Sequence, residues 1–173
     1  MILVMLGTQN NSFYRLLEEV EKEIEKGIIK EQVIVQAGYT KFKSDKMKIV
    51  DLIAKDKLEK YQEEANLIIT HGGVGSIISS IEKGKKVIAV PRLHKYEEHV
   101  NDHQKDIIKR FNEKGYIIGI SQVQELESAI KKAKDFKPKK YEQNNKKLLG
   151  MVDDFIKNTI KDKNKASIKS KKK

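Results

Sequence analysis

Short apolar runs that alternate with amphipathic segments constrain the fold of this chain more than any other feature. The runs at residues 2–6 and 87–90 are apolar throughout, which is typical of strands buried on both faces of a parallel sheet. Between such runs, apolar residues recur every three or four positions, as over residues 13–24, which indicates helices with one buried face. The alternation predicts an α/β fold, a doubly wound, six-stranded parallel Rossmann-like sheet with right-handed crossovers.

Glycine and proline residues separate the predicted elements along the chain. Pro91, for example, ends the run before it because proline cannot donate to a sheet ladder. We expect strands over residues 2–6, 32–36, 48–53, 67–70, 87–90 and 116–119. We expect helices over residues 13–24, 58–65, 77–81, 107–111, 123–133 and 148–156.

The positive charge of the chain is concentrated at its C-terminal end. The 173 residues include 36 Lys and Arg against 25 Asp and Glu, a formal net charge of +11. Residues 157–173 contain eight lysines and one acid, Asp162, and so account for +7 of this charge, which leaves +4 for the rest. The length suits one domain. We therefore expect a single domain over residues 1–156 and a Lys-rich, disordered tail over residues 157–173.

The composition excludes several classes of protein. The chain has no cysteine, which excludes disulfide scaffolds, zinc–thiolate sites and cysteine nucleophiles and favours a cytoplasmic protein. The apolar N-terminus is short and has neither the basic start nor the cleavage site of a signal peptide. No uncharged apolar run approaches the ~20 residues that span a bilayer. We expect a soluble chain whose contact with a membrane depends on a partner or on surface charge.

The most unusual loops follow the first, fourth and fifth predicted strands. In an open parallel sheet, ligands bind beyond the carboxyl ends of the strands, near the point where the strand order reverses. Polar residues and glycines fill these three loops, which we name the first loop (residues 7–12), the second loop (71–76) and the third loop (91–104). We expect the three loops to converge on one crevice.

The second loop, His71-Gly-Gly-Val-Gly-Ser76, lies between a predicted strand and a predicted helix. Glycines let the backbone approach an anion, and the free N–H groups of a helix start attract negative charge, so this loop is interpreted as a diphosphate cradle. The alternative is a tight turn with a close packing contact. Ile78 replaces the third glycine of the dinucleotide fingerprint, and no GxxxxGK[ST] loop occurs, which argues against nicotinamide or flavin cofactors and against an ATPase.

Three histidines of the third loop raise the question of a metal site. His99 and His103 are four residues apart and would share a helical face, with His94 nearby. Because Asn101 and Asp102 accompany them in a polar loop, we favour hydrogen bonding to a polar ligand or to solvent, and we expect no metal. The chain also lacks an Asp-x-Asp pair that would hold a divalent ion against a diphosphate.

Other charged residues near the loops have open roles. If a nucleotide binds, its phosphates must be neutralised by backbone amides, His71, Arg92 or lysines. Glu97 and Glu98 follow the fifth predicted strand, where they are either surface charges or ligands of hydroxyl groups.

Four motifs of the chain, taken together, resemble a known family. They are Thr70-His-Gly-Gly-Val-Gly-Ser-Ile77, Gly84-Lys-Lys-Val-Ile-Ala-Val-Pro-Arg92, Glu98-His-Val-Asn-Asp-His-Gln104 and Lys114-Gly-Tyr116. They resemble the C-terminal, donor-binding domain of glycosyltransferase family 28, which is MurG-like and forms the C-terminal half of a GT-B glycosyltransferase. The chain is similar to the stand-alone PssE-type subunit of exopolysaccharide synthesis. It is also similar to the catalytic subunit of the split eukaryotic N-acetylglucosaminyltransferase that extends dolichol-linked chitobiose.

The resemblance implies that residues 1–156 form a nucleotide-sugar-binding domain. The amides of the second loop would hold the donor diphosphate, and the first loop would face the same group. The end of the third loop would contact the hydroxyls of the transferred sugar. At the position that often carries an acid for the ribose stands Ser79, and Glu82, one turn later, is the alternative. The residues assigned to substrate binding are Gly7, Thr8, His71, Gly72, Gly73, Gly75, Ser76, Ser79, Asn101, Asp102, His103 and Gln104.

The resemblance also implies a reaction. An inverting hexosyltransferase of this kind takes a UDP-sugar as donor, and we expect it to need no cofactor. Since the family uses two such sheets, the length implies that the acceptor half is another chain. That chain would be a PssD-like, membrane-bound subunit that holds a lipid-linked saccharide in exopolysaccharide or capsule synthesis. The protein would be active only with this partner, at the inner face of the membrane. His71 and Glu97 are candidates for the catalytic base, and the partner is another source.

Two other functions compete with this interpretation. The chain could be a non-catalytic companion that stabilises or enhances a partner glycosyltransferase. A nucleic-acid module is the weaker alternative, because the basic tail has no aromatic residue to stack a base and the rest of the chain has no basic stripe. We expect the tail instead to provide weak attraction to anionic membranes, at most ~1 kcal/mol per lysine.

Overall fold

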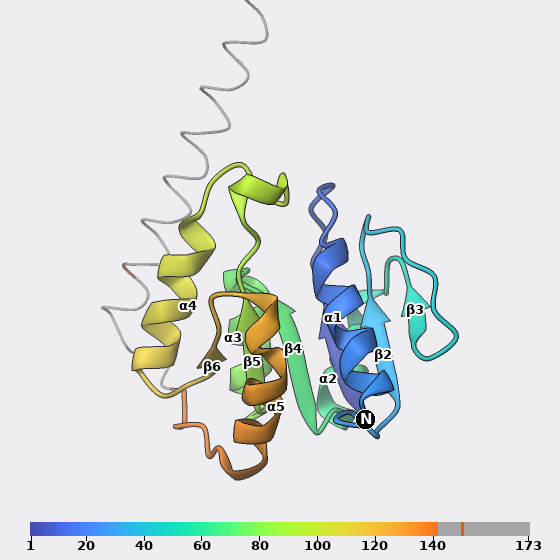
Figure 1. Ribbon diagram of the computed structural model, residues 1–173. Coiled ribbons are helices and arrows are strands. Elements are labelled where there is room, and N and C mark those ends of the chain that lie inside the picture. The colour runs from blue at the N-terminus through green and yellow to red at the C-terminus, as the bar shows by residue number, and fades with distance from the viewer. Residues whose placement is uncertain (142–149, 151–173) are drawn as a thin grey trace, which may run out of the picture. The chain divides into compact units, whose positions relative to one another are not determined.

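A computed structural model of the chain describes residues 1–141 and Gly150, and in it six strands form one parallel sheet (Figure 1). The strands are β1 (Ile2–Met5), β2 (Val33–Gln36), β3 (Lys48–Val50), β4 (Leu67–His71), β5 (Val87–Val90) and β6 (Ile118–Gly119). All residues of β1, β2, β4 and β5 are buried, as expected for strands covered on both faces. The predicted Rossmann-like sheet is confirmed.

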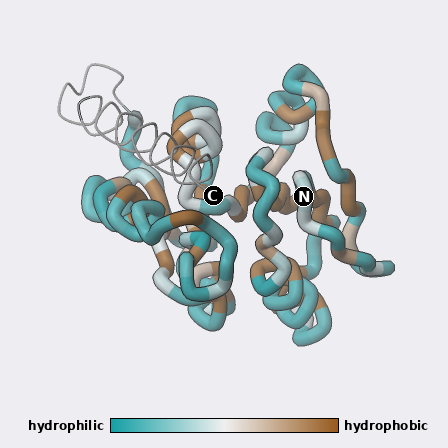
Figure 2. Tube along the Cα trace, turned by 90° about the horizontal axis from the view of Figure 1, so that it is seen from above, coloured by the Kyte–Doolittle hydropathy of each residue, from teal (hydrophilic) through white to brown (hydrophobic). Residues whose placement is uncertain are grey.

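Within residues 1–141, helices and two short 3-10 turns lie between the strands and after the last one. They are α1 (Tyr14–Glu25), α2 (Lys55–Glu64), α3 (Val74–Glu82), η1 (His94–Tyr96), α4 (His103–Glu113), η2 (Val123–Glu125) and α5 (Leu126–Asp135). In Figure 1, α1 and α5 lie in front of the sheet, and α2 and α3 lie behind it. Viewed from above, the strands form a hydrophobic layer between helices whose outer faces are hydrophilic (Figure 2).

The packing of α1 and α5 explains why the spacing of apolar residues predicted helices. Leu17 and Val20 of α1 share one buried cluster with Leu126 of α5 and with Val4 and Ile69 of the sheet. Two acids of α1, Glu19 and Glu23, are also buried, and they pair with Lys22 and Lys26. Burial of one apolar stripe thus attaches α1 and α5 to the sheet.

The strand order places a switch point at the centre of the sheet. The order is β3-β2-β1-β4-β5-β6, so β1 pairs with β2 on one edge and with β4 on the other. In the register, Ile2 faces Val33 of β2 and Leu67 of β4. The chain therefore runs outward in one direction through β3 and in the other through β6, and the carboxyl ends of β1 and β4 flank the reversal.

Most predicted elements are confirmed, with shifted ends. Helix α3 begins at Val74, inside the glycine-rich loop, and α4 begins at His103. The helix predicted over residues 148–156, the domain boundary at residue 156 and the Lys-rich tail lie outside the described residues, Gly150 apart. Across residues 1–141 and 150, none of the helices combines the length and the apolar character needed to cross a bilayer.

Candidate functional site

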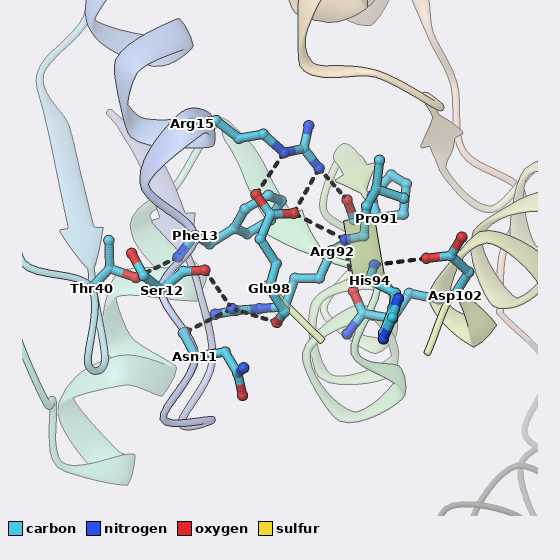
Figure 3. A network of polar contacts seen from close by, with 12 residues as sticks. Asn11, Ser12, Phe13, Arg15, Thr40, Pro91, Arg92, His94, Glu98 and Asp102 are labelled. Atoms are coloured by element: carbon cyan, nitrogen blue, oxygen red, sulfur yellow. Dashed lines mark hydrogen bonds and ion pairs between the residues drawn. The ribbon is translucent and has the colours of Figure 1, made fainter. Parts of the chain in front are cut away.

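The three loops meet beyond the carboxyl ends of β1, β4 and β5. The Arg92 guanidinium in the third loop donates a hydrogen bond to Leu6 O, just before the first loop, over 2.7 Å. The Gly72 N–H in the second loop donates to Gln104 Oε1 over 3.0 Å. Figure 3 shows the contact between the first and third loops from close by. The predicted convergence of the loops is confirmed.

His71, the last residue of β4, lies buried between two glycines. A Cβ atom added to Gly7 would lie 2.6 Å from His71 Cε1, and one added to Gly73 would overlap His71 Nε2. Gly7 also has a φ of +78°, in the left-handed region that favours glycine. The imidazole occupies the space that side chains at both positions would need, which explains why both are glycine.

The imidazole of His71 is neutral at physiological pH. Both of its hydrogen-bond contacts involve Nδ1, which lies 3.4 Å from Met5 O and 3.4 Å from Thr70 Oγ1. Because a carbonyl oxygen only accepts, Nδ1 carries the proton and Nε2 carries the lone pair. Burial, and after it the charge of Arg92, lower the pKa of His71 to about 4.

The neutral state of His71 makes the stability of the fold depend on pH. Below pH 6.5 the unfolded chain binds a proton at this residue, whereas the folded chain binds one only near pH 4. The free energy of unfolding therefore falls as the pH is lowered through this window, by on the order of 3 kcal/mol for this group.

Urea unfolding at about pH 7 and pH 4.5 tests this dependence. We expect His71→Gln to lose less stability on acidification than the wild-type protein. His94→Gln, at an exposed histidine, is the matched control and should keep the wild-type pH dependence. Equal losses in the wild type and in His71→Gln would contradict a buried, neutral imidazole.

The second loop forms the start of α3. Gly73, with φ −74° and ψ 124°, is the last residue before the helix. The first N–H groups of a helix lack partners inside it and attract anions, and here they include those of Val74, Gly75 and Ser76. Gly75 is exposed, and a Cβ atom added there would meet no atom within 4 Å. The turn thus has a closely packed half at Gly73 and an open half at Gly75.

Gln104 joins the ends of β4 and β5. Its Oε1 accepts hydrogen bonds from the Gly72 N–H and from the Arg92 N–H, each over 3.0 Å. The side chain is buried, and a Cβ atom added to Gly72 would lie 2.7 Å from Gln104 Cβ. Since Oε1 is engaged inside the fold, the contact with a sugar hydroxyl that the resemblance implies has only Nε2 to use.

The residues that lead into α4 bond mainly to one another. Asn101 Oδ1 accepts a hydrogen bond from the His103 N–H over 3.2 Å, and Asp102 Oδ1 accepts one from the His94 N–H over 2.8 Å. The ion pair with Lys105, and after it the His94 N–H, lower the pKa of Asp102. Asn101 Nδ2 is buried without a hydrogen-bond partner. These contacts shape the loop, and its role in sugar binding stays a prediction.

His99 contacts the first loop. Its Nδ1 accepts a hydrogen bond from the Asn101 N–H over 3.3 Å, and its Nε2 lies 3.2 Å from the side-chain amide of Gln9. Burial, followed by the charge of Arg92, lowers the pKa of His99. Among residues 1–141 and 150, no group of three or more His, Asp or Glu side chains is arranged to hold a metal ion.

The residues considered for the ribose lie on α3, away from its first turn. Ser79 Oγ donates a hydrogen bond to Ser76 O over 3.2 Å and accepts one from Gln62 Nε2 over 2.9 Å. The hydroxyl proton of Ser79 is therefore engaged within the helix. Glu82 is exposed at the end of α3, and Thr8 is exposed in the first loop. Ribose recognition by Ser79 or Glu82 stays a prediction, as does the contact of Thr8 with the donor diphosphate.

Glu97, a candidate base, has the only left-handed non-glycine backbone in the described part of the chain, with φ of +58°. Its carbonyl oxygen accepts a hydrogen bond from Asn11 Nδ2 over 2.8 Å. The side chain is exposed at the carboxyl edge of the sheet. Its position is compatible with a base that reaches a substrate from outside.

The sequence did not reveal the roles of Gln36, Arg15 and Glu98, which support the first and third loops. The Gln36 side chain accepts a hydrogen bond from the Gly7 N–H over 3.0 Å and donates one to Gly7 O over 2.9 Å. Glu98, expected to be either a surface charge or a ligand of hydroxyl groups, is instead buried in an ion pair with Arg15. A polar residue inside an apolar, fully buried strand was the available signal for Gln36, and no comparable signal marked Arg15 or Glu98.

Arg92 has a different position from the one expected of a phosphate ligand. Its side chain is 1% exposed, and its guanidinium donates to four main-chain carbonyl oxygens. The group is therefore part of the frame around the loops.

At the opposite, amino end of the strands, a cavity of about 450 Å³ is lined by Ile2, Ile28 and Leu67, and none of the predicted site residues lines it.

Curated proteins similar to this chain share one printed name, UDP-N-acetylglucosamine transferase subunit ALG13. The protein of Mus musculus is 35% identical over 63 residues, which are 36% of this chain and 5% of that protein. The protein of Candida albicans is 30% identical over 93 residues, which are 54% of this chain and 30% of that protein. The matched segments thus span less than a third of these relatives' length.

Solved structures show a similar fold. A solution structure of ALG13 is similar over 80% of this chain and 87% of that chain, with a TM-score of 0.52 and 18% identity. The glycosyltransferase SsfS6 of Streptomyces sp. SF2575, complexed with thymidine diphosphate, has a TM-score of 0.54 and 16% identity over 78% of this chain and 32% of its own. The fold is that of the C-terminal half of GT-B glycosyltransferases.

The family is shown by the sequence itself. The sequence model of the glycosyltransferase family 28 C-terminal domain matches residues 1–163. This range includes all the described strands and helices of the sheet and the three loops beyond its carboxyl ends. The chain therefore belongs to the family of the glycosyltransferase family 28 C-terminal domain.

Proposed function

We propose that this chain is the donor-binding subunit of a two-component inverting glycosyltransferase. It binds a UDP-sugar, and the sugar is transferred to a lipid-linked acceptor that a membrane-bound partner holds. The observation that carries the proposal is the start of α3, a glycine-rich turn with an open half, next to the switch point of a sheet of this family. The printed name of the relatives, a subunit of a UDP-N-acetylglucosamine transferase, supports both the UDP-linked donor and the division into subunits.

The donor diphosphate would lie at the first turn of α3. The N–H groups of Val74, Gly75 and Ser76 and the positive end of the helix dipole would neutralise its charge, so the proposed site uses no metal ion. Gly7, in the first loop, would approach from the other side. His71 forms the floor between the loops as a neutral ring, because a charged imidazole is disfavoured at this buried position.

The proposed reaction is a direct displacement. An acceptor hydroxyl attacks the anomeric carbon while the bond from that carbon to the diphosphate oxygen breaks, and UDP leaves with the electron pair. The amides at the start of α3 stabilise the negative charge that develops on the departing diphosphate. A base removes the hydroxyl proton. His71 is 6% exposed, so we favour the exposed Glu97 or a group of the partner as that base.

The carboxyl edge of the sheet is the surface we assign to the partner. Within the described residues, the large hydrophobic side chains that stay exposed all follow the carboxyl end of a strand. They are Tyr14, Tyr39, Leu52, Tyr96 and Val100. A groove of about 420 Å³ lined by Tyr14, Arg15 and Tyr96 opens at the same edge. A PssD-like subunit docked there would cover these side chains and bring its acceptor to the donor.

The setting of the enzyme is part of the same proposal. A membrane-bound partner would keep the chain at the inner face of the membrane, in exopolysaccharide or capsule synthesis. The lysines of residues 157–173 would add weak attraction to anionic lipid headgroups.

Calorimetric titration with uridine nucleotides tests the donor site. We expect one UDP per chain, with UMP bound about 10- to 150-fold more weakly, because a charge-assisted hydrogen bond to the second phosphate contributes ~1.5–3 kcal/mol. Lys131→Met, at an exposed position of α5, is the matched control and should bind UDP as the wild type does. The absence of heat with UDP, UMP and UDP-N-acetylglucosamine alike would refute the proposed function.

A further inference from the structure

Arg92, the second residue after β5, is among the largest side chains that the fold buries completely. Its guanidinium donates hydrogen bonds to Leu6 O over 2.7 Å and to Asn11 O over 2.8 Å. It also donates to Ser12 O over 3.3 Å and to Glu98 O over 3.2 Å. Leu6, Asn11 and Ser12 are 80 or more residues away in the sequence. One side chain thus connects the first loop to the third loop (Figure 3).

A second arginine reinforces this connection from α1. Arg15 forms a two-point ion pair with the carboxylate of Glu98, over 2.6 and 2.9 Å, and donates to Pro91 O over 2.8 Å. Both guanidinium groups lie over the ring of Phe13, with Cζ 5.2 Å from its centroid for Arg15 and 5.0 Å for Arg92. Two arginines, one carboxylate and one aromatic ring thus form a buried cluster beside the other contacts between the loops, which are Asn11 with Glu97 O and Gln9 with His99.

Stability alone does not account for an arginine at this position. Removing a guanidinium from water costs several kcal/mol, which its hydrogen bonds and a nearby carboxylate only offset. Burial lowers the pKa of Arg92 to about 10, although Glu98 raises it, so the group is charged at neutral pH. An apolar side chain would avoid this cost but would leave the main-chain oxygens that Arg92 satisfies without a donor. What arginine adds is direction, because its planar fork of donors bonds to carbonyl oxygens at fixed angles.

We propose that Arg92 is a positioning residue of the donor site, which holds the first and third loops in one fixed relation. The inference rests on the proposed function, since Gly7 and Thr8 lie on one of these loops and residues 101–104 on the other. Arg92 is buried and the donors on Nη1 and Nη2 go to main-chain oxygens, while Nε is buried without a partner, so Arg92 is not placed to touch donor or acceptor. It acts through the loops, by keeping their two sides at the spacing that a nucleotide-linked sugar needs.

Arg92→Lys tests the fork, because lysine keeps the charge but donates from a single nitrogen. The matched control is Arg110→Lys, at an exposed arginine of α4. In hydrogen exchange followed by mass spectrometry, we expect residues 7–13 and 91–100 to exchange about tenfold faster in Arg92→Lys, while β2 and β3 keep their wild-type rates. In calorimetry, we expect its affinity for UDP to fall about tenfold. Arg110→Lys should match the wild type in both measurements.

The two readouts separate a positioning role from a merely structural one. Unchanged exchange in both segments would overturn the inference, and so would faster exchange with unchanged affinity for UDP. If Arg92→Lys does not fold, Arg92→Gln decides by the same measurements, since its amide removes the charge and the fork but keeps a donor for the main-chain oxygens of the loops. A wild-type chain that binds no uridine nucleotide would refute the proposed function as well. If only this inference is wrong, the wild type still binds UDP, and Arg92→Lys binds UDP with the same affinity as the wild type.

Discussion

Gly73→Ala is expected to abolish UDP binding and to destabilise the fold. The added methyl group would overlap Nε2 of His71, whose ring is held at Met5 O through Nδ1 and already fills the space beside Gly7. The clash can be relieved only by a shift of the turn, which would displace the amides at the start of α3. Overpacking of this kind costs ~1–3 kcal/mol, or about 3–10 °C in Tm for a domain of this size.

Gly75→Ala distinguishes this clash from a general effect of losing glycine. A Cβ atom at Gly75 meets nothing within 4 Å, and the residue lies in the first turn of α3. Because alanine favours a helix over glycine by ~1 kcal/mol, the variant should keep or raise the Tm measured by circular dichroism. A Gly73→Ala protein with wild-type Tm and wild-type UDP affinity would show that His71 does not fill the turn as described.

Gln104→Met is expected to lower stability at least as strongly. Methionine has nearly the length of glutamine but no acceptor, so the N–H groups of Gly72 and Arg92 would be buried without partners. Each buried, unsatisfied donor costs ~1–3 kcal/mol, and the two together should lower Tm by about 6–20 °C. Affinity for UDP should fall as well, because Gly72 leads into the turn that would hold the diphosphate.

Gln104→Glu separates the two roles of this side chain. A carboxylate accepts both N–H groups, so this variant should recover most of the stability that Gln104→Met loses. It lacks the Nε2 donor, so it should bind UDP nearly as the wild type does but bind a UDP-sugar more weakly. If Gln104→Met unfolds at the wild-type Tm, the hydrogen bonds from the Gly72 and Arg92 N–H groups to Gln104 do not stabilise the fold.

The order of strands and helices could be predicted because the patterns that encode it are local. Residues 87–90 were predicted as a strand and form β5 with the same ends, since an apolar run there is closed by Pro91. The third strand was predicted to reach residue 53 but ends at Val50. Leu52 continues the apolar pattern, yet it is 59% exposed in a loop. An apolar letter does not distinguish a buried strand residue from an exposed surface residue.

The site could be predicted in part, for the same reason. The glycines of the second loop are adjacent in the sequence, and their place between a strand and a helix follows from the local pattern. The partners of the loops are distant, with 81 residues between Arg92 and Asn11 and 29 between Gly7 and Gln36. Such pairs depend on which strands lie side by side. The identity of a glutamate such as Glu98 also does not reveal whether its side chain is buried or exposed.

The central place of β1 affects how the chain can fold during its synthesis. β1 leaves the ribosome before the other strands of the sheet, but one of its edges pairs with β4, where Met5 faces Thr70. Until that segment emerges, the nascent chain carries an apolar strand with an open edge, which is a template for aggregation. The strand that closes this edge ends with His71. The same stretch of translation therefore supplies the strand that covers the open edge of β1 and the histidine around which the second loop packs.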